Sequence, residues 1–175
     1  MTVRGARCAA IAAAVLGLVA ARLAAQEDDI GLSLGAVPPA AQIEDLDGKP
    51  VDLAAYVGKR PLLVEFWATW CPICAELLPR MEAAQKKYGD RAEFLVVAVA
   101  VNQSKNTVRR HLEQHPMPFT FLWDGNGSAV RAFQAPATSY VAVLDAKGKV
   151  VYTGVGADQA IDAAIDKAVT GGTRR

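Results

Sequence analysis

Cysteine is scarce in this sequence. The 175 residues include only three cysteines, and one of them, Cys8, falls in an apolar stretch near the N-terminus. The rest of the chain depends on Cys71 and Cys74 for any thiol chemistry. A secreted domain held together by disulfides usually has more cysteines at wider spacing, and closing a loop of about four residues removes little entropy from the unfolded chain. The pair therefore favours a chemical role, with a purely structural disulfide as the alternative.

The sequence also lacks a cluster of basic residues. Without Arg4, Arg7 and Arg22, the chain has 16 basic and 18 acidic residues and is nearly neutral. A nearly neutral domain without a basic patch argues against nucleic acid as a partner. Glycine and proline number 14 and 9, which is ordinary and indicates no fibrous or low-complexity tract.

No apolar run is long enough to span a bilayer comfortably. The longest run, Cys8–Ala21, has about 14 residues, whereas a spanning helix needs about 20. Arg4 and Arg7 precede this run, and small residues lead to a possible cut after Ala25, so residues 1–25 have the three parts of a secretory signal peptide. An uncleaved N-terminal membrane anchor is the alternative. Both interpretations predict an extracytoplasmic protein, periplasmic or otherwise, that is secreted or membrane-anchored.

Residues 26–40 are polar or small and end in Pro38-Pro39, a composition that predicts a mobile linker. Residues 41–171 are then expected to form one domain, since their number is that of one ordinary globular unit. Turn signals and apolar runs alternate along this domain. The expected elements are hairpins around Asp47-Gly48-Lys49 and Asp145–Gly148, strands over 62–67, 94–101, 119–123, 140–144 and 149–153, and helices from 74 to 88, after Ser104, over 128–133 and over 157–169. The alternation predicts an α/β fold with helices on both faces of a central sheet.

The pair Cys71 and Cys74 lies between a buried strand and the start of a helix. A helix N-terminus presents unpaired N–H groups and a partial positive charge, which lowers the pKa of a cysteine thiol placed there. Cys71 fits the attacking cysteine, and Cys74, one helical turn later, fits the cysteine that releases the product. Pro72 suits the first helical turn because it has no N–H to lose.

A Cys-x-x-Cys pair can also be half of a zinc site. His111 and His115 complete a formal Cys₂His₂ set, at i,i+4 spacing. The interval of 37 positions between Cys74 and His111 is much longer than the roughly 12–15 of small zinc modules. The sequence therefore predicts no metal site, and it favours an ordinary surface position for both histidines.

The segment LLVEFWATWCPIC, which begins at Leu62, resembles the active-site signature of the thioredoxin superfamily, in its exported TlpA/ResA-like branch. The resemblance extends from about residue 35 to 170 and includes Pro79, which matches the proline that kinks the active-site helix. It implies a thioredoxin-like central mixed sheet flanked by helices, with an N-terminal β-hairpin addition. It also implies a thiol–disulfide oxidoreductase, acting as a reductase, whose only redox group is the disulfide Cys71–Cys74 and which has no other cofactor.

The resemblance assigns roles to three further residues near the cysteines. Glu65 matches the buried carboxylate that takes the proton from the resolving thiol, and a lone Glu inside an apolar strand should have a pKa raised by desolvation. The alternative is a Glu bonded to backbone or water at a strand end. Trp70, beside Cys71, and Pro72 are expected at the substrate-binding surface, although Trp70 also suits plain packing at the rim.

One position departs from the family pattern. The family carries a cis-proline opposite the disulfide, directly before the penultimate strand. Counting back nine residues from Gly148 gives Ser139, whereas the only nearby proline is Pro136, three residues earlier. We favour Ser139 at this substrate-binding position, with Pro136 as the alternative. A cis bond before a non-proline residue costs about 2.5–4 kcal/mol, so that we expect the bond before Ser139 to be trans.

The partners implied by the resemblance are exported proteins with thiols or disulfides and a membrane thiol electron donor. The identities of Pro72 and Ile73 do not decide between reduction and oxidation, because the reduction potentials of proteins with this kind of active site span about 150 mV. A copper-binding thioredoxin-like chaperone is the alternative function, since two thiolates suit Cu(I). That class needs a histidine facing the cysteines, which here could come only from His111 or His115.

Overall fold

A computed structural model describes residues 30–171 of the chain, so the expected signal peptide or anchor, residues 1–25, lies outside the described residues. One seven-stranded sheet runs through the described residues in the order β2-β1-β5-β4-β3-β6-β7. Its strands are β1 (Gln42–Asp45), β2 (Pro50–Asp52), β3 (Leu62–Trp67), β4 (Glu93–Val99), β5 (Thr120–Asp124), β6 (Tyr140–Leu144) and β7 (Val150–Gly154). The helices are η1 (Leu53–Ala55), α2 (Pro72–Tyr88), α3 (Lys105–Gln114), α4 (Ser128–Ala132) and α5 (Ile161–Gly171).

The three central strands are parallel, and their neighbours are antiparallel. β3 pairs with β4 and β4 with β5 in parallel. β6 pairs with β3, β7 with β6, and β1 with both β5 and β2 in the antiparallel direction. The expected mixed sheet and the N-terminal β-hairpin are therefore confirmed. The carboxyl ends of β3, β4 and β5 meet at one edge of the sheet, where the Cys-x-x-Cys segment follows β3.

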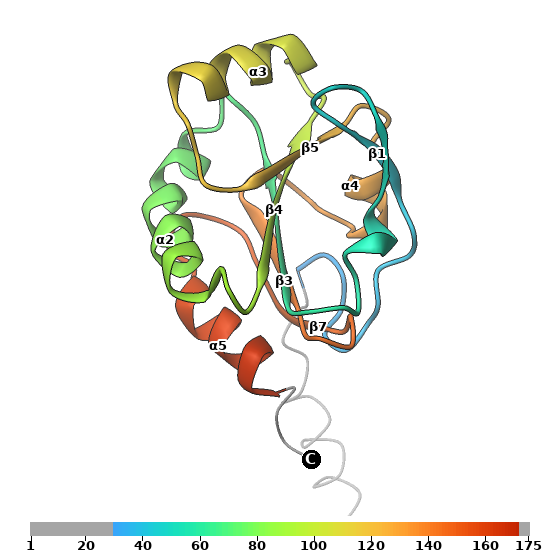
Figure 1. The fold of residues 1–175 in the computed structure, drawn as a ribbon, viewed down its shortest axis with the longest axis vertical. Coiled ribbons are helices and arrows are strands. Elements are labelled where there is room, and N and C mark those ends of the chain that lie inside the picture. Colours follow the sequence, from blue (N-terminus) through green and yellow to red (C-terminus); the bar gives the residue numbers. More distant parts are fainter. Residues whose placement is uncertain (1–29, 172–175) are drawn as a thin grey trace, which may run out of the picture.

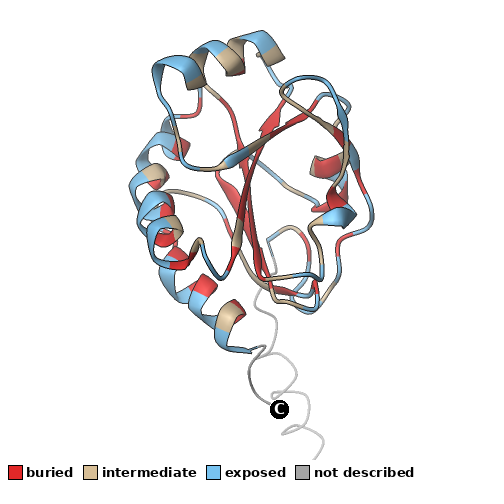
Figure 2. Cartoon of the chain, in the orientation of Figure 1, coloured by how far each residue is buried: buried red, intermediate tan, exposed pale blue. Residues whose placement is uncertain are grey.

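Helices cover the two faces of the sheet unequally. In Figure 1, α2 and α5 lie together on one side and α4 on the other, and α5 contacts β6 and β7 while α4 contacts β1 and β5. Figure 2 shows that the sheet is buried between them, while the outer sides of the helices are exposed. Every residue of β3 is buried, as its apolar run predicts. One of these buried residues, Glu65, has a carboxylate side chain.

Each face of β3 has its own apolar cluster. Leu63 belongs to the cluster that α2 and α5 build with residues such as Leu77 and Met81. Val64 and Phe66 belong to the cluster on the other face, which includes Phe133 beside α4. Because side chains alternate along a strand, Glu65 lies on the same face as Leu63, beneath the active-site helix α2.

Two expected boundaries differ from the structure. β4 ends at Val99 rather than at residue 101, because Asn102 adopts a left-handed conformation (φ 53°) that turns the chain. α5 begins at Ile161 rather than at residue 157. Gln159 is buried in this interval and bonds to backbone far away in the sequence, so tertiary contacts override the local helical pattern.

The described part of the segment expected to be a linker contacts the domain. Leu32 is buried in the core, with 7% of its surface exposed, and its N–H donates to the hydroxyl of Tyr140 at 3.2 Å. Gly35 and Ala36 exchange backbone hydrogen bonds with Val150 at 2.7 and 2.8 Å. The segment packs here because Leu32 is apolar and because the backbone of Gly35 and Ala36 bonds to Val150 of β7, the strand at the edge of the sheet. The largely polar composition of the segment did not reveal this packing.

Candidate active site

The disulfide Cys71–Cys74 lies at the N-terminus of α2. The two Cα atoms are 5.3 Å apart. Cys71 is the N-cap residue of the helix, and its sulfur accepts a hydrogen bond from the Cys74 N–H at 3.1 Å. Pro72 occupies the first turn, as expected. The positive end of the helix therefore faces the Cys71 sulfur, the arrangement that stabilises a thiolate.

The two sulfurs differ in exposure, and apolar side chains surround them. Cys71 is 6% exposed and Cys74 1% exposed, so Cys71 is the more accessible of the two residues. Trp70 and Ile73, by contrast, are 46% and 45% exposed. Trp70 directly precedes Cys71 and Ile73 lies between the two cysteines, so two exposed apolar side chains lie next to the disulfide in the sequence.

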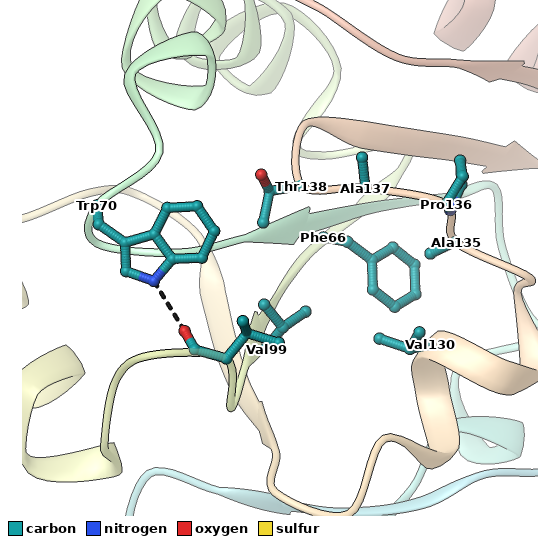
Figure 3. Close-up of a pocket in the computed structure, with 9 residues that line it drawn as sticks. Phe66, Trp70, Val99, Val130, Ala135, Pro136, Ala137 and Thr138 are labelled. Atoms are coloured by element: carbon teal, nitrogen blue, oxygen red, sulfur yellow. Dashed lines mark hydrogen bonds between the residues drawn. The ribbon is translucent and has the colours of Figure 1, made fainter.

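The loop that carries Cys71 is fixed by the loop after β4. The Thr69 N–H and hydroxyl both donate to the side-chain oxygen of Gln103 at 2.9 Å, and the Gln103 amide donates to the Val99 carbonyl at 2.6 Å. The Trp70 indole N–H donates to the Val101 carbonyl at 2.8 Å, the dashed line in Figure 3. The backbone entering the Cys-x-x-Cys segment is therefore held by side chains rather than by the disulfide alone.

Glu65 is buried without a partner for one of its oxygens. The residue is 3% exposed, and its Oε1 has no hydrogen-bond partner. Desolvation raises the pKa of the Glu65 carboxyl from its ordinary 4.5 to about 8. The register places Glu65 between Val96 of β4 and Val141 of β6, so apolar neighbours flank it on both sides. A carboxyl in such a place exchanges a proton near neutral pH.

Ser139 stands directly before β6, at the position that the register predicted. Its N–H donates to the Phe66 carbonyl at 2.8 Å, which extends the pairing of β6 with β3. No peptide bond in residues 30–171 is cis, and Ser139 has φ of 62°, a left-handed conformation that is costly for a residue with a side chain. Pro136 is exposed and lies three residues before this position.

Three hydrogen bonds hold Ser139 in this conformation. Besides its own N–H, its hydroxyl accepts from the Gly156 N–H at 3.1 Å and its carbonyl accepts from the Gln159 amide at 2.9 Å. Gln159 also donates to the Gly156 carbonyl at 2.7 Å and accepts from the Tyr152 hydroxyl at 3.2 Å. Gln159 therefore couples the start of β6 to the segment after β7.

An apolar cavity of about 320 Å³ opens beside the disulfide loop. Figure 3 shows Trp70 and Phe66 on its walls, with Thr138 and Val130 facing the same space. Pro136 forms part of its rim. The expected substrate-binding residues Trp70 and Pro136 thus border one cavity, whereas Ser139 is fully buried behind it.

The two histidines are in contact with each other on α3, with ring centroids 4.9 Å apart. His111 also packs against Trp67, with ring centroids 5.4 Å apart. Within residues 30–171, no three His, Cys, Asp or Glu side chains gather in the manner of a metal site. The copper-chaperone alternative therefore gains no support from the described residues. No helix in this range is long and apolar enough to cross a membrane.

Two residues of the site were not expected from the sequence. Gln103 and Gln159 are ordinary amides in the sequence, and no motif surrounds either of them. Each acts by bonding to backbone that lies far along the chain or across a turn. The one available signal is Ser139 itself, since a serine in place of a proline requires other groups to fix the backbone.

The fold and the bonded cysteines together define a thioredoxin-like thiol–disulfide oxidoreductase. The Redoxin family model matches residues 34–169, and the chain belongs to the Redoxin family. Thioredoxin-like protein YneN of Bacillus subtilis is 34% identical over 124 residues, which covers 69% of this chain and 70% of that protein. Thiol-disulfide oxidoreductase ResA of Bacillus subtilis is 30% identical over 120 residues, with 69% and 66% covered.

Solved structures agree with this assignment. The crystal structure of a putative thiol:disulfide interchange protein DsbE from Chlorobium tepidum has 25% sequence identity and a TM-score of 0.67, and the match covers 80% of this chain and 97% of that one. The thioredoxin domain of an oxidoreductase from Bacteroides vulgatus has a TM-score of 0.67 at 20% identity, and it supports the fold. The expected thioredoxin-like fold and resemblance are confirmed.

Proposed function

We propose that this protein reduces disulfides in exported client proteins by exchange through Cys71 and Cys74. The observation that carries the proposal is the Cys71 sulfur at the N-terminus of α2, bonded to Cys74 and facing the Cys74 N–H at 3.1 Å. Cys71 is also the more exposed of the two sulfurs, which suits the one that meets the client.

The cycle starts from the dithiol form. The Cys71 thiolate attacks one sulfur of a client disulfide, forming a mixed disulfide while the other client sulfur leaves as a thiolate and takes a proton. Cys74 then loses its proton to Glu65 and attacks Cys71. This step breaks the mixed disulfide and releases the client as a dithiol. The protein is left with the Cys71–Cys74 disulfide and needs two electrons, which a membrane thiol donor supplies by the same exchange.

Glu65 suits the proton transfer because of its burial. A pKa of about 8 is close to that of an ordinary thiol, so the proton can move from Cys74 to Glu65 at little cost. Cys74 lies in the first turn of α2, and Glu65 lies on the face of β3 that this helix covers. The apolar surface of Trp70 and Ile73 supplies contact area for a client without demanding a particular charge.

The direction of exchange depends on the reduction potential. The reductase assignment predicts a potential near those of reducing members of the superfamily, about −270 mV for thioredoxin, rather than near −120 mV, where strong oxidants lie. Equilibration of the purified protein with glutathione at known ratios measures this value. A potential near −120 mV would show an oxidase instead.

We also propose an extracytoplasmic location, which rests on the signal-like composition of residues 1–25. Fractionation of cells that express the full chain, with a protease added to intact spheroplasts, tests this proposal. Protection from the added protease would place the domain in the cytoplasm and contradict it. Retention of the uncleaved N-terminus in the membrane fraction would identify an anchor, whereas a shorter soluble form would identify a cleaved signal.

Trapping tests the assigned roles of the cysteines. Cys74→Ala should leave Cys71 in mixed disulfides with clients, which appear as slower bands on a non-reducing gel and collapse with dithiothreitol. Cys71→Ala is the matched control and should trap little, because Cys74 is only 1% exposed. If bands accumulate with Cys71→Ala alone, the roles are reversed, and if neither variant traps protein, exchange with clients is wrong.

A further inference from the structure

We propose that His111 and His115 chelate one divalent transition-metal ion, for which Zn²⁺ has the fitting geometry. His111 lies in the last turn of α3, and His115, four positions later, is the residue that caps the C-terminus of this helix. Their ring centroids are 4.9 Å apart. Two imidazoles bound to one tetrahedral zinc ion, with Zn–N bonds of about 2.0 Å, also have ring centres about 5 Å apart. The separation of the two rings therefore matches that of two imidazoles that share one ion.

The surroundings limit the motion of one ring and leave the other open. His111 is half-buried, and its ring packs on Trp67 with centroids 5.4 Å apart and planes at 59°. His115 is exposed, and its backbone N–H donates to the His111 carbonyl at 2.8 Å. An ion therefore finds one imidazole already ordered and a second within reach from solvent. Water would fill the remaining positions around it, as in open zinc sites.

The charges near the pair permit a cation. Both histidines lie at the C-terminal end of α3, where the helix dipole favours positive charge. Of the three Lys and Arg side chains on α3, Lys105 is paired with Glu44 and Arg109 with Asp47 at 2.8 Å, and Arg110 is the third.

The chemistry of the two side chains also suits a metal ligand. The imidazole nitrogen is a ligand that Zn²⁺ accepts readily.

The proposed site is separate from the thiol chemistry. In the oxidised protein both sulfurs are bonded to each other and offer no thiolate to a metal. Titration of the oxidised full-length chain carrying Cys8→Ser with Zn²⁺ therefore isolates the histidines from free thiols, and Cys71→Ser/Cys74→Ser in the same background removes the two active-site sulfurs.

Isothermal titration calorimetry near pH 7.5 should show one Zn²⁺ bound per chain. His111→Gln and His115→Gln should each weaken binding at least about tenfold, because each removes the second, intramolecular ligand. Arg110→Gln, a matched change on the same helix, should not weaken it. Cu²⁺, which quenches nearby indoles, should quench wild-type fluorescence and quench Trp67→Phe much less, since Trp67 is the indole in contact with His111.

Three results would overturn the proposal. Zn²⁺ binding that survives either histidine change within a few-fold would mean that the rings do not act together. Binding lost in Cys71→Ser/Cys74→Ser but kept in both histidine variants would place the ion at the sulfurs. No measurable binding by the wild-type chain would exclude the site. None of these results bears on disulfide exchange, which the trapping experiment tests separately.

Discussion

Replacing Glu65 by Gln should change how the stability of the protein depends on pH. The Glu65 pKa is about 8 in the folded protein and near 4.5 once the chain unfolds. Between these values the folded state keeps a proton that the unfolded state releases, so raising the pH favours unfolding. The stability associated with Glu65 is fully present below pH 4.5, falls as the pH rises, and is lost by about pH 8.

The magnitude follows from the difference between the two pKa values. Each pH unit between them costs about 1.4 kcal/mol, so the loss reaches about 3 kcal/mol at pH 7 and about 5 kcal/mol above pH 8. Glu65→Gln has nearly the same shape and cannot ionise. Relative to wild type, the variant should therefore gain about 3 kcal/mol in unfolding free energy between pH 4.5 and pH 7.

Urea denaturation of the oxidised protein at several pH values between 4.5 and 9 measures this difference. Glu82→Gln, an exposed change on α2, serves as the control and should follow the wild-type profile. If the profiles of wild type and Glu65→Gln run parallel, the folded-state pKa of Glu65 is not raised and the proposed proton transfer loses its basis. The difference between the two profiles is the informative quantity, because other ionisable groups contribute equally to both.

The remaining predictions concern the same site. Glu65→Gln should slow the release of a trapped client by about 100-fold at pH 7, and the wild-type rate should rise with pH up to about 8, in a stopped-flow assay with a model disulfide. Ser139→Gly should be more stable than Ser139→Ala by about 1 kcal/mol in urea, because both lose the bond from Gly156 and only Gly relieves the positive φ. An Ala variant that is the more stable would contradict this account. Gln159→Leu should lower the unfolding free energy by about 2 kcal/mol, since it leaves the Ser139 and Gly156 carbonyls without their donor; an unchanged midpoint would mean that water replaces the amide. Leu77→Ala should cost about 2–5 kcal/mol by chemical denaturation, because its side chain is fully buried on the inner side of α2.

The sequence alone predicted those elements whose structure depends on residues that are close together in the chain. The apolar run of β3 and the turn Asp47-Gly48-Lys49 predicted a buried strand and a hairpin, and both are present. The burial of Glu65 also followed from its place in an apolar run. These features need only neighbours in sequence, so composition and spacing reveal them.

Features that depend on distant partners could not be predicted. The left-handed conformation of Ser139 is maintained by Gln159, twenty residues later, and that bond also delays the start of α5 to Ile161. The support of Thr69 by Gln103 spans 34 positions. A single sequence does not reveal such pairs, because glutamine is mostly an exposed residue and nothing beside Gln103 or Gln159 marks either one as part of a network.

The loop that leads into the disulfide is supported by the loop after β4, and this support bears on how the backbone responds when the disulfide opens. Thr69 and Trp70 are tied to the β4 side through Gln103 and Val101, and neither tie involves a sulfur. Breaking the disulfide bond therefore leaves the hydrogen bonds of the segment before Cys71 intact. Opening the disulfide therefore requires no change in the hydrogen bonds that support the segment before Cys71, whichever direction the exchange takes.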